Sequence, residues 1–273
     1  MPEPSTLLAA IHNGELAQSP AQEVINELST KGEVDDVIEV SDQPPLQPLI
    51  PSKELLEWRR CQGQLEKRWR AHLGQSSKWI DQASVLNKAL YRARLGLSRD
   101  FLSQQSMARQ VEKAVTAKHV TSWQRFLDSS HDLLIVMESD ATVTDRLGQS
   151  LRTIKQVAQF DQPMYVNIAG GLEAAYLKID TLTQSSIPGF LSFVRPVTNT
   201  SCAYAMNRNL AHRILSFLAD SPQSTKLGID WLVNAFFLEV QAEGTSLTCL
   251  HADPPALIHG SLAGVTRSWH PDR

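Results

Sequence analysis

The sequence predicts an α/β fold, in which a sheet is flanked by helices, with a helical region towards the amino end. The first observation is the segment HDLLIVMESDATVTD, residues 131–145, where five consecutive apolar residues follow a polar pair. A short continuous apolar run is typical of a strand that is buried on both faces, as in parallel sheets. The second observation is that further short apolar segments alternate with helical periodicities beyond this strand, which favours a sheet covered by helices.

Composition excludes several classes of protein. The chain has 273 residues, 42% hydrophobic and 20% charged, so it can bury a large core, and its net charge of -3 provides no global attraction to nucleic acid. Cys61, Cys202 and Cys249 lack metal-type spacing, which indicates free thiols in a reducing compartment. No apolar run approaches the ~20 residues of a membrane helix, and the amino terminus lacks a signal-peptide pattern. We therefore expect a cytoplasmic protein; peripheral membrane association is compatible with these features.

Residues 1–51 form a poorly defined amino-terminal region. Residues 21–28 favour a short helix and residues 36–40 a short strand. Four prolines lie between Pro44 and Pro51. Because proline removes backbone donors and restricts the preceding residue, we expect an extended linker here.

Residues 52–97 predict a helical region. Ser52 is a candidate N-cap, and one face of the following helix is largely apolar: Leu55, Trp58, Gln62, Leu65, Trp69 and Leu73. The other face is basic: Arg59, Arg60, Lys67, Arg68 and Arg70. Arginines interleaved with aromatic residues can bind nucleic acid, but nearby glutamates dilute the charge, so we favour a helix packed through its tryptophans. A second helix is expected over residues 79–94, ending near Gly96.

Residues 98–273 carry the remaining pattern and are expected to form one domain. A long helix is predicted from about residue 104 to residue 128. His119 lies on its apolar stripe, one turn from Val115 and Trp123, and a histidine in such a place is usually a satisfied core residue.

Two acidic residues follow the apolar run of the central strand. Glu138 and Asp140 lie two residues apart, so in extended backbone both would point to the same side. Ligands of α/β proteins bind beyond the carboxyl ends of strands, and hard oxygen donors there suit Mg²⁺ or Mn²⁺. The alternative is a solvated strand end.

Later elements follow in a clear order. Asn207 is a candidate N-cap for an apolar-faced helix, and Asp230 is a candidate N-cap for the next one. Gly170-Gly171 predicts a turn. The other expected elements are a helix over 146–159 and strands near 163–171, 191–197, 199–205 and 246–251.

The order of these pieces resembles glycosyltransferase family 25, which includes lipooligosaccharide glycosyltransferases and procollagen galactosyltransferases. The resemblance covers about residues 98–269. It is carried by these motifs: Lys118-His119 with Trp123; Glu138-Ser139-Asp140; Ala203-Tyr204-Ala205 with Arg208 and Ala211; Asp230-Trp231; and Pro255 with His259-Gly260-Ser261.

The resemblance implies a GT-A fold whose sheet binds a nucleotide sugar. It also implies an inverting, metal-dependent transfer of a sugar, for which members of the family suggest galactose. The partners would be a nucleotide-sugar donor and a glycan or lipid-linked saccharide acceptor, with Mn²⁺ or Mg²⁺ as cofactor. On this pattern Asp140 and His259 would be metal ligands, and Glu138 would support the metal or the donor ribose. Asp230 would be the general base, because an inverting transfer needs a carboxylate to take the proton of the acceptor hydroxyl. His119 would have a supporting structural role.

Two features depart from the family pattern. Ser139 stands where the family has an aspartate in its Glu-Asp-Asp motif. The family usually begins with a clear first strand. In this chain only residues 36–40 could be its counterpart, or residues 23–28 with a poorer match, and neither segment matches well. These departures motivate a second hypothesis, in which a catalytically degenerate member of the fold acts as a binding or scaffolding module. Nucleic-acid or protein binding through the basic helix is a third.

Overall fold

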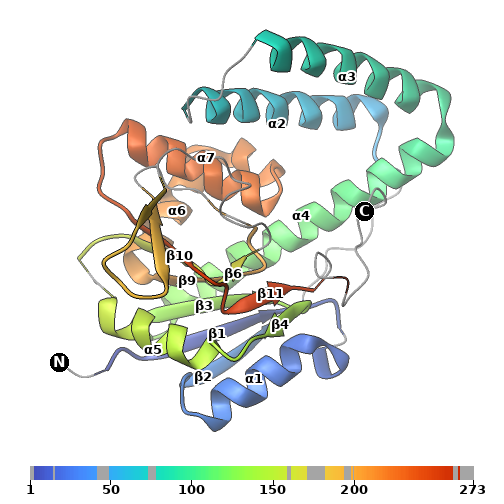
Figure 1. The fold of residues 1–273 in the computed structure, drawn as a ribbon. Helices are drawn as coiled ribbons and strands as arrows, with labels where there is room; N and C mark the ends of the chain where they lie inside the picture. Colours follow the sequence, from blue (N-terminus) through green and yellow to red (C-terminus); the bar gives the residue numbers. More distant parts are fainter. Residues whose placement is uncertain are drawn as a thin grey trace.

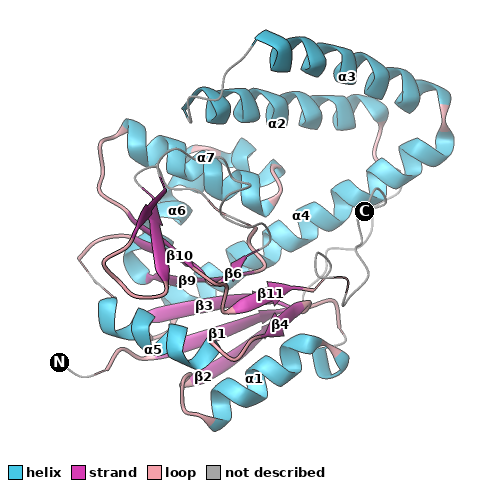
Figure 2. Ribbon diagram, viewed as in Figure 1, coloured by secondary structure: helices cyan, strands magenta, loops and turns pink. Residues whose placement is uncertain are grey.

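A mixed eight-stranded sheet organises the described part of the chain in the computed structural model (Figures 1 and 2), so the predicted α/β class, with helices flanking a sheet, is confirmed. The structure describes residues 3–14, 16–41, 49–72, 78–158, 161–170, 182–193, 198, 200–260 and 264. Several expected features lie outside these residues: most of the proline-rich segment, Gly171, residues 194–197, Asn199 and Ser261.

The strand order is β2-β1-β3-β9-β5-β10-β8-β7. β1, β2 and β3 are parallel, whereas β9 runs antiparallel to both of its neighbours, β3 and β5. The sheet is thus mixed rather than parallel throughout. The bounds are β1 Thr6–Ile11, β2 Asp36–Val40, β3 Leu133–Glu138, β5 Met164–Asn167, β7 Leu182–Gln184, β8 Phe190–Phe193, β9 Ala203–Asn207 and β10 Thr248–Ala252.

The first strand is not where the sequence suggested. β1 (Thr6–Ile11) lies between β2 and β3 and is buried along its whole length. Residues 36–40 do form a strand, β2, but in the described sheet it lies at the edge and is mostly exposed. Residues 23–28 belong to helix α1 (Pro20–Thr30). The physical reason is that the run LLAAI offers apolar side chains to both faces of the sheet, which a central strand requires and β2 lacks.

Helices cover both faces of the sheet. Leu8 and Ala10 of β1 face a core shared with α1 and α5 (Leu147–Val157), while Leu7 and Ala9 face a core shared with the helices opposite. Those are α4 (Arg99–Asp128), α6 (Arg208–Asp220) and α7 (Ile229–Ala242), and Figure 1 shows them across the sheet from α1 and α5. This alternation is what the two-residue period of a strand produces.

α2 (Ser52–His72) and α3 (Lys78–Leu97) form the expected helical pair, which lies beyond α7 and away from the sheet (Figure 1). Leu65 and Trp69 of α2 are buried in the core that also contains α7. On the basic face, Arg59 stacks over the rings of Trp58 and Tyr91, and Arg68 pairs with Glu239 at 3.9 Å. These contacts agree with the packed-helix interpretation.

Helix starts were predicted with mixed success. Asn207 caps α6 as expected, because its side chain accepts a hydrogen bond from the Leu210 amide. Ser52 is the first residue of α2 rather than its cap, with the Pro51 carbonyl accepting the Glu54 amide at 2.9 Å. The N-cap of α7 is Gly228, so the expectation that Asp230 caps this helix is wrong. Its carboxylate instead accepts a hydrogen bond from another segment, described below.

A small second sheet joins distant parts of the chain. Its order is β4-β11-β6, from Ala141–Val143, Leu257–His259 and Ala169–Gly170. The pairing places His259 opposite Ala141, immediately after the acidic motif. Among the described helices, none is both long enough and sufficiently apolar to cross a bilayer.

Candidate functional site

The acidic motif and His259 meet where the two sheets join. Asp140 lies in the turn between β3 and β4, and its Oδ2 is 3.1 Å from His259 Nδ1. The Gly260 amide donates a 2.9 Å hydrogen bond to the Asp140 carbonyl, which continues the pairing of β4 with β11. Both side chains are partly exposed, with 24% of Asp140 and 19% of His259 accessible. The structure thus brings together two residues that the sequence separates by more than a hundred positions.

Cys202 completes this cluster and was not among the predicted site residues. Its thiol lies 3.6 Å from Asp140 Oδ1 and is 1% exposed. One ligand atom from each of Asp140, Cys202 and His259 lies within 4.8 Å of the others, so the three could hold a metal ion. The signal that could have found it is the small, polar composition of residues 199–205, which suits a strand that runs close under a ligand.

Glu138 ends a chain of buried hydrogen bonds. Its Oε1 lies 3.2 Å from His119 Nε2; His119 Nδ1 lies 2.9 Å from the Tyr204 hydroxyl, which accepts from Trp123 Nε1 at 2.8 Å. Because an indole N–H can only donate, the Tyr204 hydroxyl proton points to His119 Nδ1. In that arrangement the N–H that faces Glu138 is the one on His119 Nε2, which donates the hydrogen bond to Glu138. His119 is fully buried, as expected of a core residue, and this chain orients the Glu138 carboxylate.

Asp230 faces the same region from the first turn of α7. Its Oδ1 accepts a 2.8 Å hydrogen bond from the Ser201 hydroxyl, and Ser201 precedes Cys202. Burial raises the pKa of Asp230 above its ordinary value; the Ser201 hydrogen bond opposes this rise, the charge of Glu138 adds to it, and His119 and His259 lower it. In the segment Ser201-Cys202, the Ser201 side chain therefore contacts Asp230 and the Cys202 side chain contacts Asp140.

Thr200 holds this segment in an unusual backbone conformation. Its φ of 66° lies in the left-handed region, which β-branched residues rarely adopt. Its carbonyl accepts a 2.7 Å hydrogen bond from Asn167 Nδ2, and the Glu138 amide donates to the Cys202 carbonyl at 2.8 Å. Such strain costs about 1–3 kcal/mol and persists where surrounding contacts enforce it. Here those contacts set the positions of Ser201 and Cys202.

The charges of the cluster influence one another. Burial lowers the pKa of His259, but its hydrogen bond to Asp140 and the negative charges of Asp140, Glu138 and Asp230 outweigh burial, so the net shift is upwards. Burial, with Asp140 and Glu138 nearby, raises the pKa of the Cys202 thiol well above its ordinary value. The region is therefore negatively charged and attractive to a cation.

A buried lysine lies beside this region at the end of β1. Lys118 is 1% exposed, and its ammonium group donates to the His12 carbonyl at 2.6 Å and to Asn13 Oδ1 at 2.7 Å. The register of the sheet sets Ile11 opposite Glu138, so the turn that Lys118 contacts follows directly beside the acidic motif. Lys118 belongs to the Lys118-His119 motif, but no sequence pattern indicated that its ammonium group would contact the end of β1.

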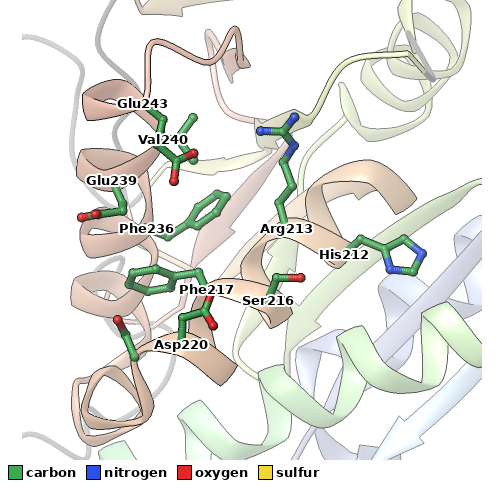
Figure 3. Close-up of a pocket in the computed structure, with 10 residues that line it drawn as sticks. His212, Arg213, Ser216, Phe217, Asp220, Phe236, Glu239, Val240 and Glu243 are labelled. Atoms are coloured by element: carbon green, nitrogen blue, oxygen red, sulfur yellow. The ribbon is translucent and has the colours of Figure 1, made fainter.

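A separate pocket lies between α6 and α7 (Figure 3), with Phe217 and Phe236 between the helices and charged residues at its rim. Its α7 residues begin at Phe236, towards the opposite end of the helix from Asp230. The residues lining it are His212, Arg213, Ser216, Phe217, Asp220, Ser221, Phe236, Glu239, Val240 and Glu243, none of which belongs to the Asp140 cluster.

Comparison with known proteins finds similarity among solved structures. No family profile matches the chain, and no curated protein matches it. A solved structure described as a glycosyltransferase involved in the glycosylation of the major capsid of PBCV-1 is similar over 94% of this chain and 92% of that chain, with 11% sequence identity and a TM-score of 0.37. A similarity at this level carries no argument about function, which must come from the site itself.

Proposed function

We propose that this protein is a glycosyltransferase of the family 25 type. It would move a sugar, with galactose as the first candidate, from a nucleotide-sugar donor to a glycan or lipid-linked saccharide acceptor. The observation that carries the proposal is the convergence of Asp140, His259 and Asp230, three residues from separate parts of the chain, around the segment Ser201-Cys202.

The residues of the cluster have distinct roles in the proposed reaction. Asp140 and His259 would hold a divalent metal, and a bound metal would neutralise the negative charge of the departing diphosphate. Asp230 takes the proton of the acceptor hydroxyl as the sugar is transferred with inversion, and its raised pKa makes it a stronger base than an ordinary aspartate. Ser201 orients this carboxylate, and His119 orients Glu138 towards the donor side.

The direct test is to incubate the full chain with a panel of nucleotide sugars and to measure release of free nucleotide with and without divalent cations. We expect metal-dependent turnover that Asp140→Ala abolishes while the circular dichroism spectrum stays unchanged. Asp145→Ala is the matched control, because this exposed aspartate lies outside the cluster and its loss should leave turnover intact. Absence of nucleotide-sugar binding and turnover with every cation tested would refute the proposal.

A degenerate member of the same fold, acting as a binding or scaffolding module, is the second candidate. The observation that favours it is Ser139, which leaves the acidic motif with one carboxylate fewer than the family pattern. A complementation test in cells distinguishes the two: the module should work unchanged with Asp140→Ala and Asp230→Ala, whereas the enzyme should fail with either.

A further inference from the structure

We propose that Asp140, Cys202 and His259 form a three-ligand site that selects Zn²⁺ over the Mg²⁺ or Mn²⁺ expected from the sequence. The inference concerns the same cluster as the proposed function and deepens it. It rests on the donor atoms and their spacing, so it can be tested without any sugar substrate.

The spacing of the donor atoms suits a tetrahedral ion. Zinc binds histidine nitrogen and carboxylate oxygen at about 2.0–2.1 Å and thiolate sulfur at about 2.3 Å, so tetrahedral angles place ligand atoms roughly 3.3–3.6 Å apart. The His259 Nδ1 to Asp140 Oδ2 distance is 3.1 Å, and the Cys202 Sγ to Asp140 Oδ1 distance is 3.6 Å. The two contacts use different oxygens of Asp140. One ligand atom from each of the three residues lies within 4.8 Å of the others, so the side chains must close in from that separation to enter the zinc coordination sphere.

The chemistry of the donor set points the same way. Mg²⁺ requires near-octahedral oxygen ligands and keeps its waters, and carboxylate or carbonyl oxygens suit Mn²⁺. A set of one sulfur, one nitrogen and one oxygen matches borderline-soft Zn²⁺ instead. The cysteine is the discriminating ligand. Glu138, the other acidic residue of the motif, is engaged with His119 at 3.2 Å.

The surrounding backbone holds the three residues in place before any ion binds. The Asp140 carbonyl accepts a hydrogen bond from the Gly260 amide, and the Cys202 carbonyl accepts one from the Glu138 amide. His259 lies in the small sheet opposite Ala141. Three protein ligands leave one tetrahedral position open, which is the pattern of zinc sites that bind water or substrate, whereas structural sites have four protein ligands. If the proposed function holds, a diphosphate oxygen would occupy that position.

The experiment uses the purified full chain stripped of metal by chelation. Titration with Co²⁺, a spectroscopic substitute for zinc, should produce a sulfur-to-cobalt charge-transfer band in the near ultraviolet, and Zn²⁺ should displace the cobalt. Calorimetric titration should give an affinity for Zn²⁺ at least about 100-fold above that for Mn²⁺ or Mg²⁺, as the preference of thiolate ligands implies.

Cysteine variants locate the sulfur ligand. Cys202→Ser should abolish the band and weaken Zn²⁺ binding by more than the roughly 10–100-fold that loss of an outer hydrogen-bond partner costs a metal site. Cys61 is exposed on α2, and Cys249 is buried outside the cluster, so Cys61→Ser and Cys249→Ser should leave both the band and the affinity unchanged.

Three results would overturn the inference: no charge-transfer band in the wild-type chain, equal or tighter binding of Mn²⁺ or Mg²⁺, or a band that survives in Cys202→Ser. If Cys202→Ser fails to fold, X-ray absorption of the zinc-loaded wild type decides, since it must show a sulfur neighbour at about 2.3 Å. Zinc binding without nucleotide-sugar turnover would uphold this inference while refuting the proposed function, and turnover with Mn²⁺ alone would do the reverse.

Discussion

Removal of a single hydroxyl tests the hydrogen-bonded chain behind the acidic motif. Tyr204→Phe keeps the ring that stacks on His119 and Tyr165 but deletes the group between Trp123 and His119. Trp123 is fully buried, so its N–H would have no partner, at a cost of about 1–3 kcal/mol. His119 Nδ1 would lose a donor, at a further cost of about 1 kcal/mol.

The expected total is about 2–4 kcal/mol of unfolding free energy. In a chain of this length that corresponds to a fall in Tm of roughly 5–10 °C. Urea denaturation and thermal unfolding followed by circular dichroism measure both quantities. The expectation assumes that Phe fills the space of the ring, so that the cost comes from lost hydrogen bonds and not from a cavity.

Tyr165→Phe is the matched control in the same core. Its hydroxyl contacts Thr198 Oγ1 at 2.9 Å and Asn167 Nδ2 at 3.4 Å, but both partners also donate to the Thr200 carbonyl. We therefore expect a cost of only about 1 kcal/mol. If Tyr204→Phe destabilises the protein no more than Tyr165→Phe, then Trp123, Tyr204 and His119 do not form the continuous buried chain described above.

Two further predictions concern residues that the family motifs single out. Arg208 donates to the carbonyls of Phe126, Leu127, Ser129 and His131 at the end of α4, so Arg208→Met should lower the unfolding free energy by about 2–4 kcal/mol; a cost below about 1 kcal/mol in urea titrations would contradict this capping role. Because the pKa of Asp230 is raised on folding, its ionised form destabilises the metal-free protein at neutral pH. Asp230→Asn should therefore raise Tm at pH 7. This gain should shrink as the pH falls through the raised pKa, because Asp230 itself then becomes neutral. An unchanged or lower Tm at pH 7, together with unchanged nucleotide-sugar turnover, would remove Asp230 from the site.

Local patterns predicted the elements whose sequence and surroundings agree. The apolar run of β3, the four-residue period of α4 and the Asn207 cap of α6 all depend on contacts within a few residues, and each appears where the sequence indicated. The sequence also singled out Asp140 and His259 as partners, although through the family resemblance and not through any local pattern. Their proximity in the structure depends on the pairing of β4 with β11.

Other features had no local signal. β1 was missed because a five-residue apolar run near the amino end does not reveal that it will lie between two other strands. Aspartate is a residue type that often caps helices, but Gly228 is the N-cap of α7. The Asp230 carboxylate instead accepts a hydrogen bond from Ser201, which is distant in the sequence. The sequence indicated only a free thiol at Cys202, and the turn at Thr200 places this thiol against Asp140.

By itself, the sequence determined the class of fold and most of its helices and strands, because hydrophobic periodicity and capping act over short distances along the chain. Only the tertiary structure decided which side chains meet. The pairing of β3 with β9 and of β4 with β11 brings Cys202 and His259 to Asp140, and long-range backbone hydrogen bonds of this kind have no signature in either segment alone. That meeting turns a strand end with two acids into a candidate zinc site, since the identity of a metal depends on the complete set of ligands around it.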